Sequence, residues 1–247
     1  MNHFFSKEGG LSFEVFGIAH IITIATLVFT AMMIYFFRVK LRGVVLNKVF
    51  RFGLAITLIL VQFSFYFWQF YHNQISLQTS LPLNLCAISI FLAAYMLWTK
   101  SYALFEVLYF WALAGALQAY LTPELFYGYD HFRYYQFFIG HGLIIIAPLF
   151  MCFIHQYRPT FRSLIKAFVT INLYALFVYF IDVLVEANYL LLRHKPKTDS
   201  LLDFFGPWPY YILVLEVAAI ILFTLLYVPF LFSKNQSKIE LENELNL

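Results

Sequence analysis

Long apolar stretches alternate with short polar segments along almost the whole chain. A helix that crosses about 30 Å of hydrocarbon needs roughly 20 mostly apolar residues. Most stretches reach that length, whereas the third is shorter. No barrel-like alternation of apolar and polar residues appears, so helices are the spanning elements that the pattern favours. The sequence therefore predicts an all-α integral membrane protein, a bundle of seven transmembrane helices over residues 13–37, 49–70, 83–98, 102–121, 134–155, 164–187 and 209–232.

Composition points to the same class. Of the 247 residues, 62% are hydrophobic and only 12% are charged, whereas a soluble globular domain averages about 25% charged residues. We expect one seven-helix transmembrane domain over residues 1–232 and a charged cytoplasmic tail over residues 233–247. Both cysteines lie inside apolar stretches, so no disulfide framework is expected.

Basic residues gather in the loops after the first, third and fifth predicted helices and in the tail. Loops rich in Lys and Arg stay on the cytoplasmic side of a membrane. We therefore expect a multi-pass protein of the cell (plasma) membrane, with the N-terminus outside and the C-terminus in the cytoplasm. The same residues suit contacts with lipid headgroups rather than a nucleic-acid site. They are Arg38, Lys40, Arg42, Lys48, Arg51, Lys100, Arg158, Arg162 and Lys166, with Lys234 and Lys238 in the tail.

Polar side chains inside the predicted helices fall almost entirely in the outer half of the membrane. They occupy the starts of helices that run inward and the ends of helices that run outward. Such groups are costly in a bilayer and are candidates for function. The distribution predicts a polar cavity that opens toward the outer leaflet. Its candidate residues are His20, Gln69, Asn84, Cys86, Gln118, His141, Asp182 and Glu186.

Each candidate also has a structural interpretation. A buried cysteine such as Cys86 often acts as a small hydrophobic residue, but a thiolate with a base nearby is a nucleophile. His141 and His20 lie at a suitable depth to be that base. Asp182 and Glu186 have several possible roles. They could orient a histidine, bind a cation or pass protons, or they could simply be hydrated at the rim of the membrane. The glutamines also suit hydrogen bonds between helices.

Several segments together resemble a known family. They are GIAHI with His20, LPLNLC ending at Cys86, FYFWALAGALQAYLTPEL, FFIGHG with His141, and the stretch from Asn188 to Leu213. The chain is similar to the YwaF-type seven-helix membrane proteins of Gram-positive bacteria and to the animal transmembrane protein 164 group. This resemblance implies fatty-acyl transfer on (lyso)phospholipids, with Cys86 and His141 as the working pair.

One position departs from the family pattern. Asn84 stands two residues before the cysteine, where the family usually has histidine, although asparagine also donates and accepts hydrogen bonds. We count Asn84 and Asn188 as supporting residues. The expected partners are membrane lipids, with no nucleic acid, cofactor or metal ion. Two alternatives stay open: a transporter or binding protein that uses the same cavity, and a non-catalytic accessory protein of the envelope. The sequence does not give the oligomeric state.

Overall fold

The computed structural model describes residues 3–195 and 201–245, and their side chains over residues 3–195 and 202–231. Within these ranges the protein is all-helical, as the hydrophobic pattern predicts, and no strand occurs. Ser12 and Tyr127 form an isolated antiparallel bridge between two loops. The all-α fold class is therefore confirmed.

Six helical segments are long and apolar enough to cross a membrane. The helix α4 (Leu85–Thr99) is apolar but has only 15 residues, fewer than the roughly 20 that a full crossing needs. The count of seven spans therefore stays a prediction. The six segments are α1 (Ile18–Phe36), α3 (Val44–Tyr71), α5 to α6 (Tyr102–Leu121), α7 (Phe132–His155), α8 (Phe161–Val185) and the apolar part of α9 (Tyr210–Leu245).

Two helix starts differ from the hydrophobic pattern. The first helix begins at Ile18, not at residue 13, because Phe16 has a left-handed backbone (φ 59°) and Gly17 is an extended N-cap. The helix α3 begins at Val44, five residues before the predicted span, and includes Lys48. Charged residues end an apolar stretch but do not end a helix. Helix formation depends on the backbone, whereas hydropathy reports only whether a side chain prefers water or lipid.

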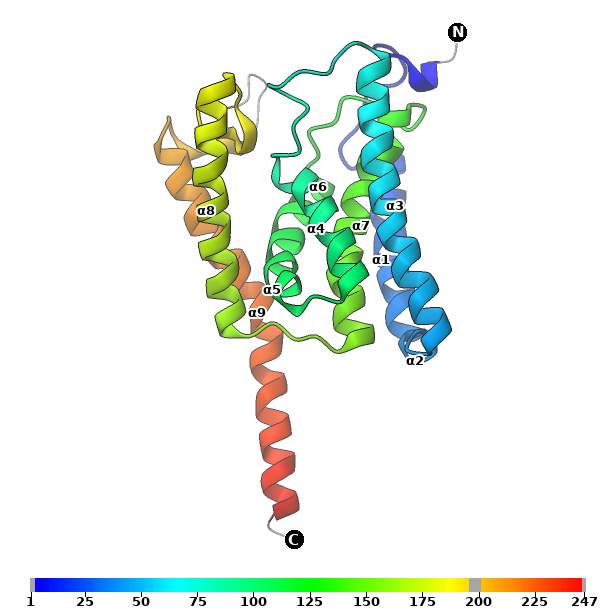
Figure 1. Ribbon diagram of the computed structural model, residues 1–247, viewed down its shortest axis with the longest axis vertical. Helices are drawn as coiled ribbons and strands as arrows, with labels where there is room; N and C mark the ends of the chain where they lie inside the picture. Colours follow the sequence, from blue (N-terminus) through cyan, green and yellow to red (C-terminus); the bar gives the residue numbers. More distant parts are fainter. Residues whose placement is uncertain (1–2, 196–200, 246–247) are drawn as a thin grey trace.

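The most buried helices lie at the centre of the bundle. The helix α7 and the α5 to α6 segment bury more than half of their apolar residues, whereas α1, α8 and α9 bury only about a tenth of theirs. Figure 1 shows α4 to α7 between α1 and α3 on one side and α8 and α9 on the other. The outer helices present Ile, Leu, Phe and Val side chains outward, which suits contact with lipid.

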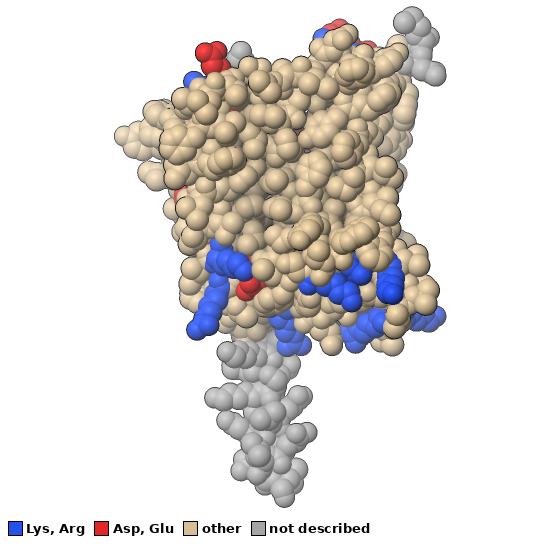
Figure 2. All heavy atoms as spheres, viewed as in Figure 1, with Lys and Arg blue, Asp and Glu red and all other residues tan. Residues whose placement is uncertain are grey.

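The two ends of the bundle differ in charge. The end that holds the N-terminus, here called the N-terminal end, also holds residues 72–84, 122–131, 186–195 and 201–209. Figure 2 shows Lys and Arg side chains gathered at the other end, here called the basic end. The helices α4 and α7 both run from the N-terminal end to the basic end, because Lys100 after α4 and His155 at the end of α7 line one pocket there. The described part of the basic end includes Arg42, Lys48, Lys100 and Lys166.

Candidate functional site

His20 is fixed by hydrogen bonds at both ring nitrogens. The Phe16 backbone N–H donates to Nδ1 (2.9 Å), and Nε2–H donates to the carbonyl oxygen of Tyr120 (2.9 Å). The side chain is fully buried and packs against the rings of Phe13 and Phe138. These two bonds fix the orientation of the ring and occupy both of its nitrogens. His20 therefore fits a structural role that joins the start of α1 to α6 (Leu117–Leu121).

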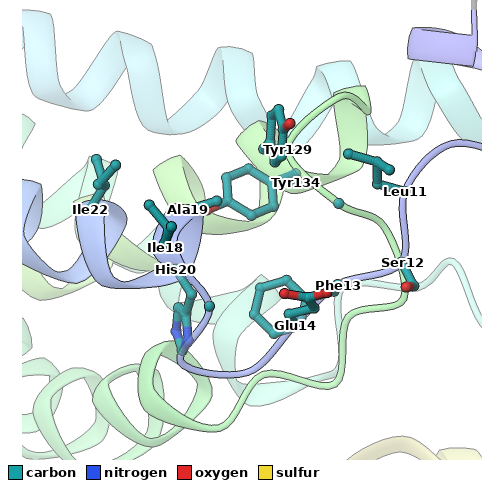
Figure 3. Close-up of a pocket in the computed structure, with 12 residues that line it drawn as sticks. Leu11, Ser12, Phe13, Glu14, Ile18, Ala19, His20, Ile22, Tyr129 and Tyr134 are labelled. Carbon is teal, nitrogen blue, oxygen red and sulfur yellow. The ribbon is translucent and has the colours of Figure 1, made fainter.

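A cavity of about 510 Å³ lies beside His20 at the N-terminal end. Figure 3 shows α1 on the left, the N-terminal segment with Leu11 and Ser12 on the right, and Tyr129 and Tyr134 between them. Of the residues that the sequence predicts for the polar cavity, His20 is the one that lines it. The predicted residues therefore do not share this cavity.

His141 has one ring nitrogen committed and one available. It lies in the third turn of α7, and its Nδ1 is 2.8 Å from the carbonyl oxygen of Phe137, one turn earlier in the same helix. A carbonyl oxygen only accepts, so Nδ1 carries the proton. Nε2 has no hydrogen-bond partner among the described residues. The imidazole therefore presents an unprotonated nitrogen, as a general base requires.

Cys86 is a free, half-buried thiol in the first turn of α4. The helix follows Asn84, whose side chain makes no capping bond, and the first turn contains no acidic residue. The first helical bond at this end is from the Ile88 N–H to the Asn84 carbonyl. The amides of the first turn thus have no partner within the helix, and such amides favour negative charge next to them.

Cys86 and His141 lie on neighbouring parallel helices. A side chain built on Gly140 of α7 would meet Ile90 of α4 at 3.8 Å, so the two helices touch there. Cys86 is four residues before Ile90, on the same face and about 6 Å nearer the N-terminal end. The His141 ring also leans toward that end, because it bonds to Phe137. The thiol and the imidazole therefore lie on adjoining helices that both start at the N-terminal end.

A short π-helix, η2 (Ala112–Ala116), packs beside the start of α4. It joins α5 (Tyr102–Trp111) to α6. Gly115 in this segment packs against Leu85, the residue before Cys86. A Cβ added to Gly115 would lie 3.4 Å from the Leu85 side chain, which is ordinary contact distance. Such π-bulges often occur at functional sites. Sequence reasoning missed this feature, although the small residues in ALAGA mark the position.

Asp182 belongs to a clamp that holds the loop before α4. Its Oδ1 accepts from the Tyr189 N–H (2.9 Å). The Tyr189 hydroxyl donates to the Leu77 carbonyl and accepts from the Leu81 N–H. Burial raises the pKa of Tyr189, which keeps this hydroxyl protonated. Among the described residues no hydrogen bond joins Asp182 to a histidine, so the carboxylate supports the start of α4 rather than an imidazole.

The other predicted residues occupy less central positions. Glu186 is an exposed helix C-cap, and Gln118 is exposed and bonds to Thr122 in its own helix. Gln69 is buried, and its Oε1 has no partner. Asn188 bonds to Arg193 and His194 and shapes the loop after α8, while the Asn84 Oδ1 accepts a long bond from Leu190 (3.4 Å). Within the described chain no group of three His, Cys, Asp or Glu suits a metal ion.

Arg133 is a further residue of interest that the hydropathy pattern did not single out. It lies about two turns before His141 on α7, with its guanidinium 4.1 Å from the centre of the Phe65 ring and bonded to Gln136. No carboxylate among the described residues pairs with it.

Comparisons with known proteins support the membrane class and the family. No curated protein and no solved structure matches the chain. The model of the TMEM164 family matches residues 15–227, which include α1 to α8 and most of the apolar part of α9. Together with its apolar helices, this match shows that the chain is a membrane protein of the TMEM164 family.

Proposed function

We propose that the protein transfers fatty-acyl groups between membrane lipids, or hydrolyses them from lipids, with Cys86 as nucleophile and His141 as general base. The observation that carries the proposal is the hydrogen bonding of His141: Nδ1–H is tied to Phe137 and leaves Nε2 as a proton acceptor. His141 lies on α7, next to α4, whose first turn carries the Cys86 thiol. Family membership agrees with this chemistry without testing it.

The first step is acylation of the thiol. Nε2 of His141 takes the proton of Cys86, and the sulfur attacks the ester carbonyl carbon of a lipid. The carbon–oxygen ester bond breaks, and the proton passes from His141 to the leaving alcohol. Free amides in the first turn of α4 suit the oxyanion that forms, because they are fixed donors at the position of the thiol. The product is an acyl-thioester on Cys86.

The second step releases the acyl group. The hydroxyl of a lysolipid, or of water, gives its proton to His141 and attacks the thioester carbonyl. The carbon–sulfur bond breaks, and the thiol recovers a proton. Acyl transfer and hydrolysis therefore differ only in the acceptor, and the proposal includes both.

We further propose that the basic end faces the cytoplasm of a cell whose plasma membrane holds the protein. Basic loops favour that side. Cys86 and His141 would then lie in the outer half of the bilayer, one to three turns below the N-terminal end. Ester carbonyls of outer-leaflet lipids lie at such a depth, which supports a lipid substrate.

The test is capture of the acyl-enzyme. The purified protein in lipid nanodiscs is incubated with a phospholipid that carries a labelled acyl chain, with and without a lysophospholipid acceptor. Intact mass and peptide mass spectrometry then locate the adduct. Cys86→Ala and His141→Gln are the test variants, and Cys152→Ala is the matched control because Cys152 is also a half-buried helical thiol.

The expected result is a hydroxylamine-sensitive acyl adduct on Cys86 that disappears when the acceptor is added. It should be absent in Cys86→Ala, strongly reduced in His141→Gln and unchanged in Cys152→Ala. An adduct that persists without Cys86, or that forms equally on Cys152, would refute the nucleophile. Label transfer that proceeds normally in His141→Gln would refute the base.

A further inference from the structure

A second site candidate lies at the basic end, far from Cys86. Three helix ends meet around a pocket of about 270 Å³: the start of α3, the C-cap of α4 and the last residues of α7. Asn47 forms part of its wall and is itself tied down, donating to the Leu41 carbonyl and bonding to Nε2 of His155 (3.2 Å). The pocket therefore has a fixed polar wall. Its volume is below the range for whole small-molecule ligands, about 300–1,000 Å³, and suits one headgroup.

The pocket is lined by positive charge. Arg42, Lys48 and Lys100 border it, and no acidic side chain does. Lys48 and Lys100 have no hydrogen-bond or ion-pair partner among the described residues. The one acidic side chain described near this end, Glu106, is already bonded to Lys166 and Ser163 (both 2.7 Å). The charge of the pocket is therefore not compensated within the described part of the chain.

The start of α3 adds fixed donors to these cations. This 28-residue helix follows Gly43, has no side-chain cap and carries no acidic residue in its first turn. The first intrahelical bond runs from the Asn47 N–H to the Gly43 carbonyl, so the N–H groups of residues 44–46 have no partner within the helix. Helix N-termini with free amides bind phosphate groups well, and nearby lysines strengthen the binding.

A separate apolar groove lies further along α3, toward the middle of the bundle. It has a volume of about 350 Å³ and runs between α3 and α4, from Trp98 to Leu60. Trp98 of the groove lies two residues before Lys100 of the pocket, and its ring packs against Phe52 of α3. On α3, Val44 and Lys48 of the pocket continue at helical spacing into Ala55 and Ile59 of the groove. Pocket and groove thus follow one face of α3.

We infer that this pocket binds the phosphate of an anionic phospholipid, with one acyl chain of that lipid in the α3–α4 groove. The cations and free amides supply charge complementarity for the phosphate. The groove, lined almost entirely by apolar side chains, supplies contact for the chain. Basic pockets between helices bind anionic headgroups in this way. The site is separate from the proposed acyl transfer, and each can fail without the other.

The test is lipid binding to the full chain in neutral phosphatidylcholine nanodiscs. Phosphatidylglycerol is titrated in, and retained lipid is measured by native mass spectrometry and melting temperature. The double variant Lys48→Gln/Lys100→Gln removes two charges from the pocket. The matched control, Arg38→Gln/Arg162→Gln, removes two charges from the same end outside the pocket. Ile56→Trp fills the groove at a half-exposed position, and sn-glycerol 1-phosphate tests the soluble headgroup alone.

The pocket variant should lose about 30-fold in phosphatidylglycerol affinity, against less than about threefold for the control. Ile56→Trp should bind phosphatidylglycerol more weakly than the wild-type protein does. In nanodiscs of phosphatidylcholine alone, this variant and the wild-type protein should have the same melting temperature. Equal losses in the pocket and control variants would mean diffuse surface attraction and overturn the site. Binding of glycerol phosphate as tight as that of the lipid, with no effect of Ile56→Trp, would overturn the lipid assignment.

Discussion

The surroundings of His20 and His141 show how differently one residue type is used in the same half of the bundle. His20 lies in the first turn of α1 and His141 in the third turn of α7, and both helices start at the N-terminal end. His20 bonds to two separate segments and is fully buried, whereas His141 bonds only within its own helix. Hydrogen-bond partners, not depth in the membrane, separate a structural histidine from one with a free basic nitrogen.

The largest effect should be on acyl-enzyme formation, and it should distinguish the two histidines. His141→Gln removes the proton acceptor, and general-base catalysis contributes about 100-fold or more. His20→Gln leaves that acceptor intact. The rate of labelled acyl transfer to Cys86, measured on folded protein at a temperature below both melting transitions, should fall by about that factor only in His141→Gln. Equal losses in both variants would remove the distinction.

The free energy of unfolding should show the reverse order, with a larger loss on removing His20 than on removing His141. His20→Ala leaves the buried Tyr120 carbonyl and the partly buried Phe16 N–H without their partners, at a cost of about 3 kcal/mol. His141→Ala loses a bond within one helix and should cost about 1 kcal/mol or less. Thermal unfolding of both variants in the same detergent tests this. A melting temperature that falls further in His141→Ala would contradict the assignment of His20 as the structural residue.

The clamp before α4 should have a smaller effect that reaches the site indirectly. Tyr189→Phe removes the hydroxyl that joins Leu77 and Leu81, and we expect a loss of about 1–2 kcal/mol. Because the clamp positions the start of α4, labelling of Cys86 by a lipid-like thiol probe should also change. Tyr210→Phe, which alters an exposed tyrosine of α9, is the control. Unchanged stability and unchanged labelling would show that the clamp does not support α4.

The smallest expected effect concerns pH at the N-terminal segment. His131 precedes α7, accepts from the Arg133 N–H and donates to the Ser6 carbonyl. Burial lowers the pKa of His131 below its ordinary value of 6.5. Because the pKa of His131 is lower in the folded protein than in the unfolded chain, the unfolded chain takes up its proton first as the pH falls. Stability should therefore be full above about pH 6.5 and decrease as the pH falls below it. His131→Asn should flatten this dependence, measured as melting temperature between pH 7.5 and 5. A wild-type curve that is flat, or that rises on acidification, would contradict the prediction.

Most of the fold could be predicted from hydropathy alone. Apolar stretches long enough to span a bilayer must form helices there, because each backbone N–H and C=O needs a partner within the segment. Helix ends were harder to predict, as the starts of α1 and α3 show. The π-helix within the fourth predicted span could not be predicted either, because hydropathy does not record backbone hydrogen bonding.

The candidate site was predicted in part. Polar residues in apolar stretches pointed to Cys86, His141, His20 and Asp182 because burying them needs a reason. Sequence could not rank them, since each side chain's role depends on which segments reach it. His20 meets Tyr120, a hundred residues away, and Asp182 meets Tyr189 across a loop. Arg133 differs from an ordinary loop cation because no carboxylate in the described part of the chain pairs with it.

The sequence by itself determined the membrane class, the helical fold and the list of candidate polar groups, because these follow from local composition and the cost of placing polar groups in lipid. Only the tertiary structure decided which histidine has a free nitrogen, which helices lie beside the thiol, and where basic residues enclose a pocket. Those properties depend on contacts between segments far apart in the chain, and local hydropathy carries no information about which segments meet.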